Sequence, residues 1–186
     1  MNILTAYRAN YVTPPPPKLL SLKCVEWRTF YISDVAEIVS GHDIYDAERL
    51  PGDIPYIGAS AMNNGVTHFV SNKNETLESE CISVNRNGSV GYAFYHPYEA
   101  LYSNDCRKLR PKVKNRYVSL FLTTAITSQR GKYNYGYKMG TARLMRQQII
   151  LPADSSGNPD WNFMTQYMQQ TEQILLARYL SHIADS

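Results

Sequence analysis

The sequence has 186 residues, of which 44% are hydrophobic and 19% charged, and its formal net charge is +3. This length predicts one main domain with a substantial core, and the apolar fraction excludes a wholly disordered chain. No apolar run approaches the roughly 20 residues of a membrane-spanning helix, and the first residues lack the basic and apolar segments of a signal peptide. We therefore expect a soluble, cytoplasmic protein that does not act at a membrane.

The positive charges are unevenly distributed along the chain. Residues 106–153 contain no Asp or Glu but 11 Lys and Arg, which leaves 8 basic and 16 acidic residues elsewhere. A block of one sign with tyrosines among it is typical of a surface that binds nucleic acid. The alternative is an ordinary solvated face whose counter-charges come from the acidic remainder once the chain folds.

The sequence divides into three segments. Residues 1–24 form a leader or linker that includes the stiff proline run 14–17. Residues 25–152 have the apolar patterning of a folded domain, and residues 153–186 contain a long terminal helix.

Within the domain, short apolar segments alternate with turn signals. A short helix or turn is expected over residues 32–39, and a helix with one buried face over residues 117–127. The sequences Asn63-Asn64-Gly65 and Asn87-Gly88 are turn signals that each lie between two apolar segments. Strands are expected at residues 54–57, 66–70, 80–84, 89–95, 99–102, 106–110 and 144–151. These elements predict a mixed α/β (α+β) domain with a curved, largely antiparallel sheet and a few helices, followed by a protruding C-terminal helix.

A helix of about 25 residues is predicted to begin at Pro159, since proline is favoured in the first turn. Its apolar positions form one stripe: Trp161, Met164, Met168, Leu175, Tyr179 and Ile183. Such a stripe either packs on the chain's own domain or binds a partner helix, which includes the same helix of a second copy.

The sequence contains no catalytic or cofactor motif. Neither residues 13–18 nor residues 158–161 have the Asn/Asp-Pro-Pro-aromatic order of an amino-methyltransferase, and no glycine-rich phosphate loop occurs. The four histidines and three cysteines lack the spacing of metal ligands or of a disulfide framework. We expect a non-enzymatic protein without a metal or a cofactor of its own.

Residues suited to DNA contacts gather in loops. Arginine makes bidentate hydrogen bonds with guanine and asparagine with adenine, whereas basic side chains and tyrosines suit the backbone. The alternative for Asn87 is that it only supplies the positive φ of a turn before Gly88. The candidate DNA-binding residues are Asn63, Asn64, Asn85, Arg86, Asn87, Lys132, Tyr133, Tyr135, Tyr137, Lys138, Arg143 and Arg146.

Several of these segments, in this order, resemble the target recognition domains of type I restriction-modification specificity subunits. The segments are 54–66 (IPYIGASAMNNGV), 85–91 (NRNGSVG), 135–138 (YGYK), 149–152 (IILP) and 157–164 (GNPDWNFM). The resemblance covers about residues 27–170 and includes the branch found in related type II systems. It implies a mixed α/β recognition domain followed by a long helix that spaces two such domains.

The resemblance also implies a function. Such subunits select the double-stranded DNA sequence, a partner methyltransferase using S-adenosylmethionine methylates adenine there, and a restriction subunit, when present, cuts unmodified DNA. A full subunit has two recognition domains and two helices, whereas this chain has one of each. It therefore resembles a half-subunit that forms a homodimer, a part of a longer subunit, or a module that exchanges with one. The alternative is a protein-interaction or regulatory half-subunit with only non-specific DNA affinity.

Overall fold

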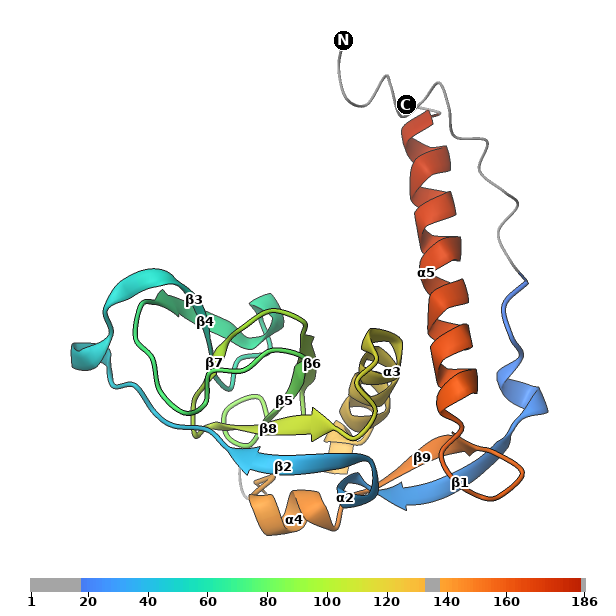
Figure 1. Cartoon of the computed structure of the whole chain (residues 1–186), viewed down its shortest axis with the longest axis horizontal. Coiled ribbons are helices and arrows are strands. Elements are labelled where there is room, and N and C mark those ends of the chain that lie inside the picture. Colours follow the sequence, from blue (N-terminus) through green and yellow to red (C-terminus); the bar gives the residue numbers. More distant parts are fainter. Residues whose placement is uncertain (1–17, 133–137, 185–186) are drawn as a thin grey trace.

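The computed structural model describes residues 18–132 and 138–184, and Figure 1 shows their arrangement. The described strands form three sheets, of which two are entirely antiparallel. The first pairs β1 (Glu26–Tyr31) with β9 (Gln148–Ala153). The second has the order β2 (Ala36–Ser40), β8 (Cys106–Pro111), β5 (Cys81–Asn85) and β6 (Ala93–His96). The third has the order β4 (Val66–Val70), β3 (Pro51–Ile57) and β7 (Leu101–Tyr102), with β3 and β7 parallel.

Four α-helices and several 3-10 turns complete the described part of the chain. The helices are α2 (Ile32–Val35), α3 (Arg116–Thr127), α4 (Thr141–Met145) and α5 (Trp161–Ala184). The 3-10 turns are η1 (Leu22–Cys24), η2 (Asp46–Glu48), η3 (Asn63–Gly65) and η4 (Arg130–Lys132). The mixed α/β prediction is confirmed, with the strands distributed over three sheets. None of the described helices has the length and apolar composition of a membrane span.

The main core lies between the four-stranded sheet, helix α3 and strand β9. Leu109, Leu122 and Ile149 are fully buried within it. Helix α3 begins where the sequence predicts, because the Asn115 side chain accepts hydrogen bonds from the amides of Tyr117 and Val118. This cap satisfies amides that the first turn of a helix leaves without partners, and it fixes the residue at which the helix begins.

Helix α5 divides into a packed base and an exposed upper part (Figure 1). Met164 is fully buried in the main core, and Trp161 and Met168 pack against it. The base of the helix therefore follows the packing alternative and completes its own domain, and Met164 has no exposed surface for a partner. Higher up, Leu175 and Tyr179 are 57% and 62% exposed.

Three predicted elements differ in the structure. The expected strand 89–95 starts only at Ala93, as β6, because residues 89–92 belong to the turn that follows Gly88. Residues 32–39 were expected to form one helix or turn, but residues from Ala36 onward extend along β8 as strand β2. Ile38 and Val39 are β-branched, and a neighbouring strand favours their extended form. The expected strand 144–151 begins instead with the end of α4, and β9 starts at Gln148, opposite Tyr31 of β1. Strand β1 was not predicted, since its residues are exposed or half-buried and show no alternation.

Candidate nucleic-acid interface

The loop between β3 and β4, residues 58–65, has an unusual backbone. Asn63, Asn64 and Gly65 all have positive φ, at 50°, 52° and 79°. Asparagine is the side chain best tolerated there after glycine, which explains the sequence. The Gly65 amide donates to the Met62 carbonyl at 2.9 Å and the Gly58 amide to the Gly65 carbonyl at 2.9 Å. The loop is thus tightly closed, and it leaves both asparagines and Met62 exposed.

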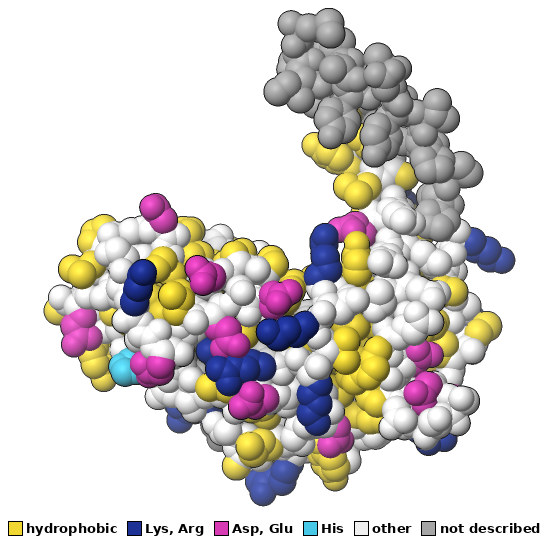
Figure 2. Space-filling view, in the orientation of Figure 1, with side chains coloured by type: hydrophobic (Ala, Val, Ile, Leu, Met, Phe, Trp, Pro, Cys, Tyr) yellow, Lys and Arg dark blue, Asp and Glu magenta, His cyan; other side chains and the backbone are white. Residues whose placement is uncertain are grey.

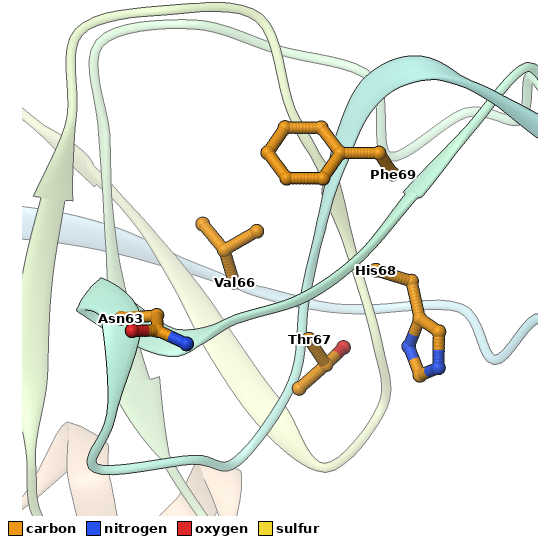
Figure 3. Close-up of a pocket in the computed structure, with 5 residues that line it drawn as sticks. All are labelled: Asn63, Val66, Thr67, His68 and Phe69. Carbon is orange, nitrogen blue, oxygen red and sulfur yellow. The ribbon is translucent and has the colours of Figure 1, made fainter.

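Figure 3 shows a shallow depression beside this loop, lined by Asn63 and residues 66–69 of β4. Val66 and Phe69 project to one side of the strand, and Thr67 and His68 to the other. Phe69 is 60% exposed. The loop therefore continues into a surface with amide, hydroxyl, imidazole and aromatic groups rather than into an enclosed pocket.

The second loop, residues 85–92, is held by Asn85, which is fully buried. Its Nδ2 donates to the Ser60 carbonyl at 2.9 Å, and its backbone amide donates to the Tyr92 carbonyl at 2.8 Å. The predicted base contact by Asn85 is therefore corrected: a side chain without exposure that bonds a neighbouring loop positions that loop. Sequence reasoning also missed Ser60, which lies within the segment 54–66 but contributes only its backbone carbonyl.

Arg86 and Asn87 follow on the same loop and are half-buried. Both of their backbone amides donate to the Asp105 carbonyl, at 2.9 and 3.2 Å. The Asn87 side chain donates to the Asp105 carboxylate, so its amide nitrogen already has a partner within the protein. Gly88 has a φ of 56°, and an added Cβ would lie 2.8 Å from the Ala59 carbonyl oxygen. The turn predicted at Asn87-Gly88 is therefore present, and Asn87 stays a candidate DNA-binding residue.

A third, basic segment lies beside the second loop. The Arg130 guanidinium is 4.6 Å from the centre of the Tyr92 ring and also donates to its hydroxyl. The Arg107 Nε donates to Thr141 Oγ1 at 2.7 Å, which ties the start of α4 to β8. Tyr92 and Arg107 were missed by sequence reasoning, because both lie outside the motifs and Arg107 lies within a strand.

The remaining candidate residues flank these contacts. Lys132, Lys138 and Arg146 are exposed, and Arg143 donates to the Lys138 carbonyl. Tyr133, Tyr135 and Tyr137 lie outside the described residues. We call residues 58–65, 85–92, 128–132 and 138–146 the loop cluster. The Asn85–Ser60 and Arg130–Tyr92 contacts join the first three segments, and Thr141 ties the fourth to the adjoining strand β8.

Some cations of the acid-free stretch 106–153 form ion pairs with acidic residues. Lys108, which is buried, lies 2.7 Å from a Glu78 carboxylate oxygen, and Arg110 Nε lies 2.8 Å from the other. Burial opposes ionisation of Glu78, but hydrogen bonds from Lys108 and Arg110 lower its pKa below the ordinary value. Arg116 pairs with Glu172 at 2.7 Å. For these cations the alternative interpretation is correct: acidic residues from elsewhere in the chain neutralise them. Figure 2 shows basic and acidic side chains next to one another over the middle of one face.

The described residues give no support for hydrolysis or metal chemistry. Ser83 Oγ and His96 Nε2 are 2.9 Å apart, an arrangement that a hydrolase would use, but both residues are fully buried. Burial lowers the pKa of His96 to about 4, so the imidazole is neutral near pH 7. In residues 18–132 and 138–184, no group of three His, Cys, Asp or Glu could hold a metal ion. The loop cluster, with amides, guanidinium groups and aromatic rings, is suited to binding a polyanion.

Comparison with known proteins places the chain in a family. The sequence model of the type I restriction modification DNA specificity domain matches residues 24–178. A curated relative, the type II restriction enzyme BgcI specificity subunit S.BcgI of Heyndrickxia coagulans, is 41% identical over 169 residues, which is 90% of this chain and 50% of that protein.

Solved structures share the fold. The S subunit of a type I restriction-modification system from M. genitalium matches with a TM-score of 0.59 and 21% identity, over 88% of this chain and 42% of that chain. The HsdS subunit from Thermoanaerobacter tengcongensis matches with a TM-score of 0.57 and 17% identity, over 88% of this chain and 41% of that chain. The chain thus spans half or less of each of these proteins. The family match covers most of the sequence, and the chain belongs to the family of type I restriction-modification DNA specificity domains.

Proposed function

We propose that this chain is a non-catalytic DNA recognition unit that directs a partner adenine methyltransferase to a specific sequence. One observation carries the proposal. Loops that are distant in the sequence are joined into a single exposed surface by Asn85, which bonds Ser60, and by Arg130, which contacts Tyr92. The family to which the chain belongs supports DNA as the ligand of that surface.

The residues of the loop cluster divide into two roles. Asn63 and Asn64 expose amide groups, so these two are candidates for base contacts. Arg86 has a guanidinium on a firmly held loop, which suits a contact with either a base or a backbone phosphate. Lys132, Lys138 and Arg146 are exposed and suit phosphate contacts, which fix the register of a protein on DNA without reading its sequence. Asn87 would contact a base only after leaving Asp105.

The partners follow from the same proposal. S-adenosylmethionine would bind the methyltransferase, and this chain would hold no cofactor. A restriction subunit would join where the system includes one, and the complex would act on DNA in the cytoplasm. The upper part of α5 is suited to a second copy of the chain, because Leu175 and Tyr179 are exposed and apolar. Hydrophobic side chains are visible on that part of the helix in Figure 2. A homodimer would then supply two recognition domains.

The exposed upper part of α5 also favours a second candidate function. In that case the chain is an interaction or regulatory module, it binds its partner through residues 175–183, and its loop cluster has only non-specific DNA affinity. This candidate predicts that removing the exposed apolar side chains abolishes every effect of the chain. It also predicts that Arg86→Ala changes none.

A methylation map separates the two functions. The cognate methyltransferase is expressed with and without this chain, and modified adenines are located by long-read sequencing. We expect one motif that is present only with the chain and is lost or relaxed in Arg86→Ala, with the variant still folded. A palindromic motif would support the homodimer. The same motif in the absence of the chain would contradict the proposal.

A further inference from the structure

Arg107 is a buried cation whose partners are all neutral. It is 6% exposed. Its Nε donates to Thr141 Oγ1, and its Nη1 donates to the backbone and side-chain oxygens of Asn104 at 2.9 and 3.0 Å. Within the described part of the chain, no carboxylate oxygen lies within 4.0 Å of it, and its Nη2 makes no hydrogen bond. A buried charge without a counter-charge is costly to maintain, which indicates that it serves a purpose other than stability.

A second guanidinium lies beside the first. Arg86 Nη1 is 3.5 Å from the Asn104 carbonyl oxygen, the atom that Arg107 Nη1 also approaches. Two like charges on one carbonyl repel each other, and burial together with the Arg86 charge lowers the pKa of Arg107. An anion between the two groups would convert this repulsion into attraction.

The nearest acidic groups are already committed to other partners. Asp43 accepts a hydrogen bond from the Asn104 amide at 2.8 Å, and Asp105 accepts one from the Asn87 side chain. Both carboxylates raise the pKa of Arg107, but among the described residues neither forms an ion pair with Arg107 or with Arg86. They hold the loop around the arginines and leave the two guanidinium groups without a direct counter-ion.

We propose that Arg86 and Arg107 together bind one phosphate group of the DNA backbone at the base of the loop cluster. Guanidinium groups donate planar, paired hydrogen bonds that match the oxygens of a phosphodiester. Thr141 and Asn104 hold Arg107 in place, and the phosphate would approach its Nη2. The inference rests on the proposed function for the identity of the ligand. The anion site itself does not depend on that function.

Inorganic phosphate tests the anion site without DNA. Thermal denaturation of the full chain is measured in phosphate and in chloride at equal ionic strength, for the wild type, Arg86→Gln, Arg107→Gln and the control Arg28→Gln. Arg28 is an exposed arginine on β1 that pairs with Glu26, so its replacement removes the same charge elsewhere. Phosphate stabilises proteins generally, so the readout is the difference between variants. We expect the extra stabilisation in the wild type and the control and its loss in both test variants. Equal stabilisation of all four would overturn the site.

A duplex with neutral methylphosphonate groups tests whether the ligand is a DNA phosphate. Each backbone position of the methylated motif is replaced in turn, and the Kd is measured for the wild type, Arg86→Gln and Arg28→Gln. We expect one position at which the replacement weakens wild-type binding by about tenfold and leaves Arg86→Gln binding unchanged. The slope of log Kobs against log salt should also fall by about 0.9 in the variant, as for one phosphate lost.

The outcomes separate this inference from the proposed function. If a motif is methylated but the methylphosphonate costs are the same in Arg86→Gln as in the wild type, the inference fails and the function stands. If phosphate stabilises the wild type and Arg28→Gln but neither Arg86→Gln nor Arg107→Gln, and no DNA motif depends on the chain, the anion site stands and the function fails. If Arg107→Gln does not fold, the anion site is tested with Arg86→Gln and with Arg107→Lys, which keeps the charge.

Discussion

Two neighbouring cations of strand β8 have opposite surroundings. Lys108 points to the side of the sheet where Glu78 lies, and it is buried, ion-paired and placed 5.4 Å from the Tyr102 ring centre. Arg107 is also buried, but among the described residues its hydrogen bonds go to neutral groups, and a second arginine lies beside it. Adjacent residues of a strand face opposite sides of the sheet. Neighbouring positions can therefore hold one charge that is neutralised by an acidic residue and one that has no counter-charge. A charge count along the sequence cannot distinguish the two.

Glu78→Ala should have the largest effect on stability, because it leaves buried Lys108 without its counter-charge. Removing one partner of a buried ion pair typically costs about 3–5 kcal/mol. Urea denaturation of the wild type and the variant measures the loss. Since Glu78 belongs to the paired side of β8, the salt dependence of DNA binding should stay unchanged wherever the variant remains folded. A loss below about 1 kcal/mol would mean that the ion pair is accessible to water.

His96 adds a pH dependence to the same buried region. Its ring lies 5.7 Å from that of Tyr102, and burial lowers its pKa from 6.5 to about 4. The unfolded chain therefore binds a proton at a higher pH than the folded chain does. The stabilisation is complete above pH 6.5 and is lost as the pH falls toward 4, at about 1.4 kcal/mol per pH unit.

The measurement is denaturant unfolding of the wild type and His96→Gln at pH 7, 6 and 5. The free energy of unfolding of the wild type should fall by about 2 kcal/mol more than that of the variant. Parallel pH profiles would show that His96 already binds a proton in the folded protein.

Asn85→Ala should have an intermediate effect. It leaves the Ser60 carbonyl without its donor inside the loop cluster, at a cost of about 1–3 kcal/mol. Because the same bond joins loops 58–65 and 85–92, hydrogen exchange at the Gly65 amide should become faster. Asn72→Ala is the control: its Nδ2 donates to the Glu48 carbonyl at 2.9 Å and its Oδ1 accepts from the Leu50 amide at 2.8 Å, but both bonds lie at the exposed surface, where water replaces them. Equal losses in both variants would show that burial of Asn85 has no special role.

Arg116→Gln should have the smallest effect. Arg116 belongs to the acid-free stretch but is exposed and paired with Glu172, and such pairs contribute about 0.5 kcal/mol or less. Methylation should keep its motif in this variant, in contrast to Arg86→Ala. Replicate methylation maps of the two variants measure the motif. A changed motif in Arg116→Gln would contradict the distinction between cations that are paired with an acidic residue and cations that are not.

Local patterns predicted much of the fold. The turn signals at Asn63-Asn64-Gly65 and Asn87-Gly88 lie between strands as expected, and helix α3 has its predicted buried face. The pattern failed where an element depends on distant pairing. Strand β1 exists because β9 lies beside it, and β2 is extended because β8 is its neighbour.

The candidate site was predicted in part for the same reason. The motifs lie on loops that the structure brings together, but the side-chain orientation of Asn85 depends on a contact with Ser60, 25 residues away. In the sequence, Arg107 is one basic residue of a predicted strand. That it has no carboxylate partner among the described residues is visible only in the folded structure. The stripe of α5 was correct as a pattern, but the core occupies its lower half and leaves only its upper part exposed.

Photo-crosslinking tests most directly whether the loop cluster is the DNA surface. A benzophenone side chain replaces Met62, which is 70% exposed on the first loop, or Thr29, which is exposed on β1 outside the loop cluster. Each variant, assembled with the methyltransferase, is irradiated on a duplex that contains the methylated motif. The account predicts a crosslink from position 62 that an excess of unlabelled specific duplex abolishes, and none from position 29. Crosslinks from position 29 alone would place the DNA on another face and contradict the account.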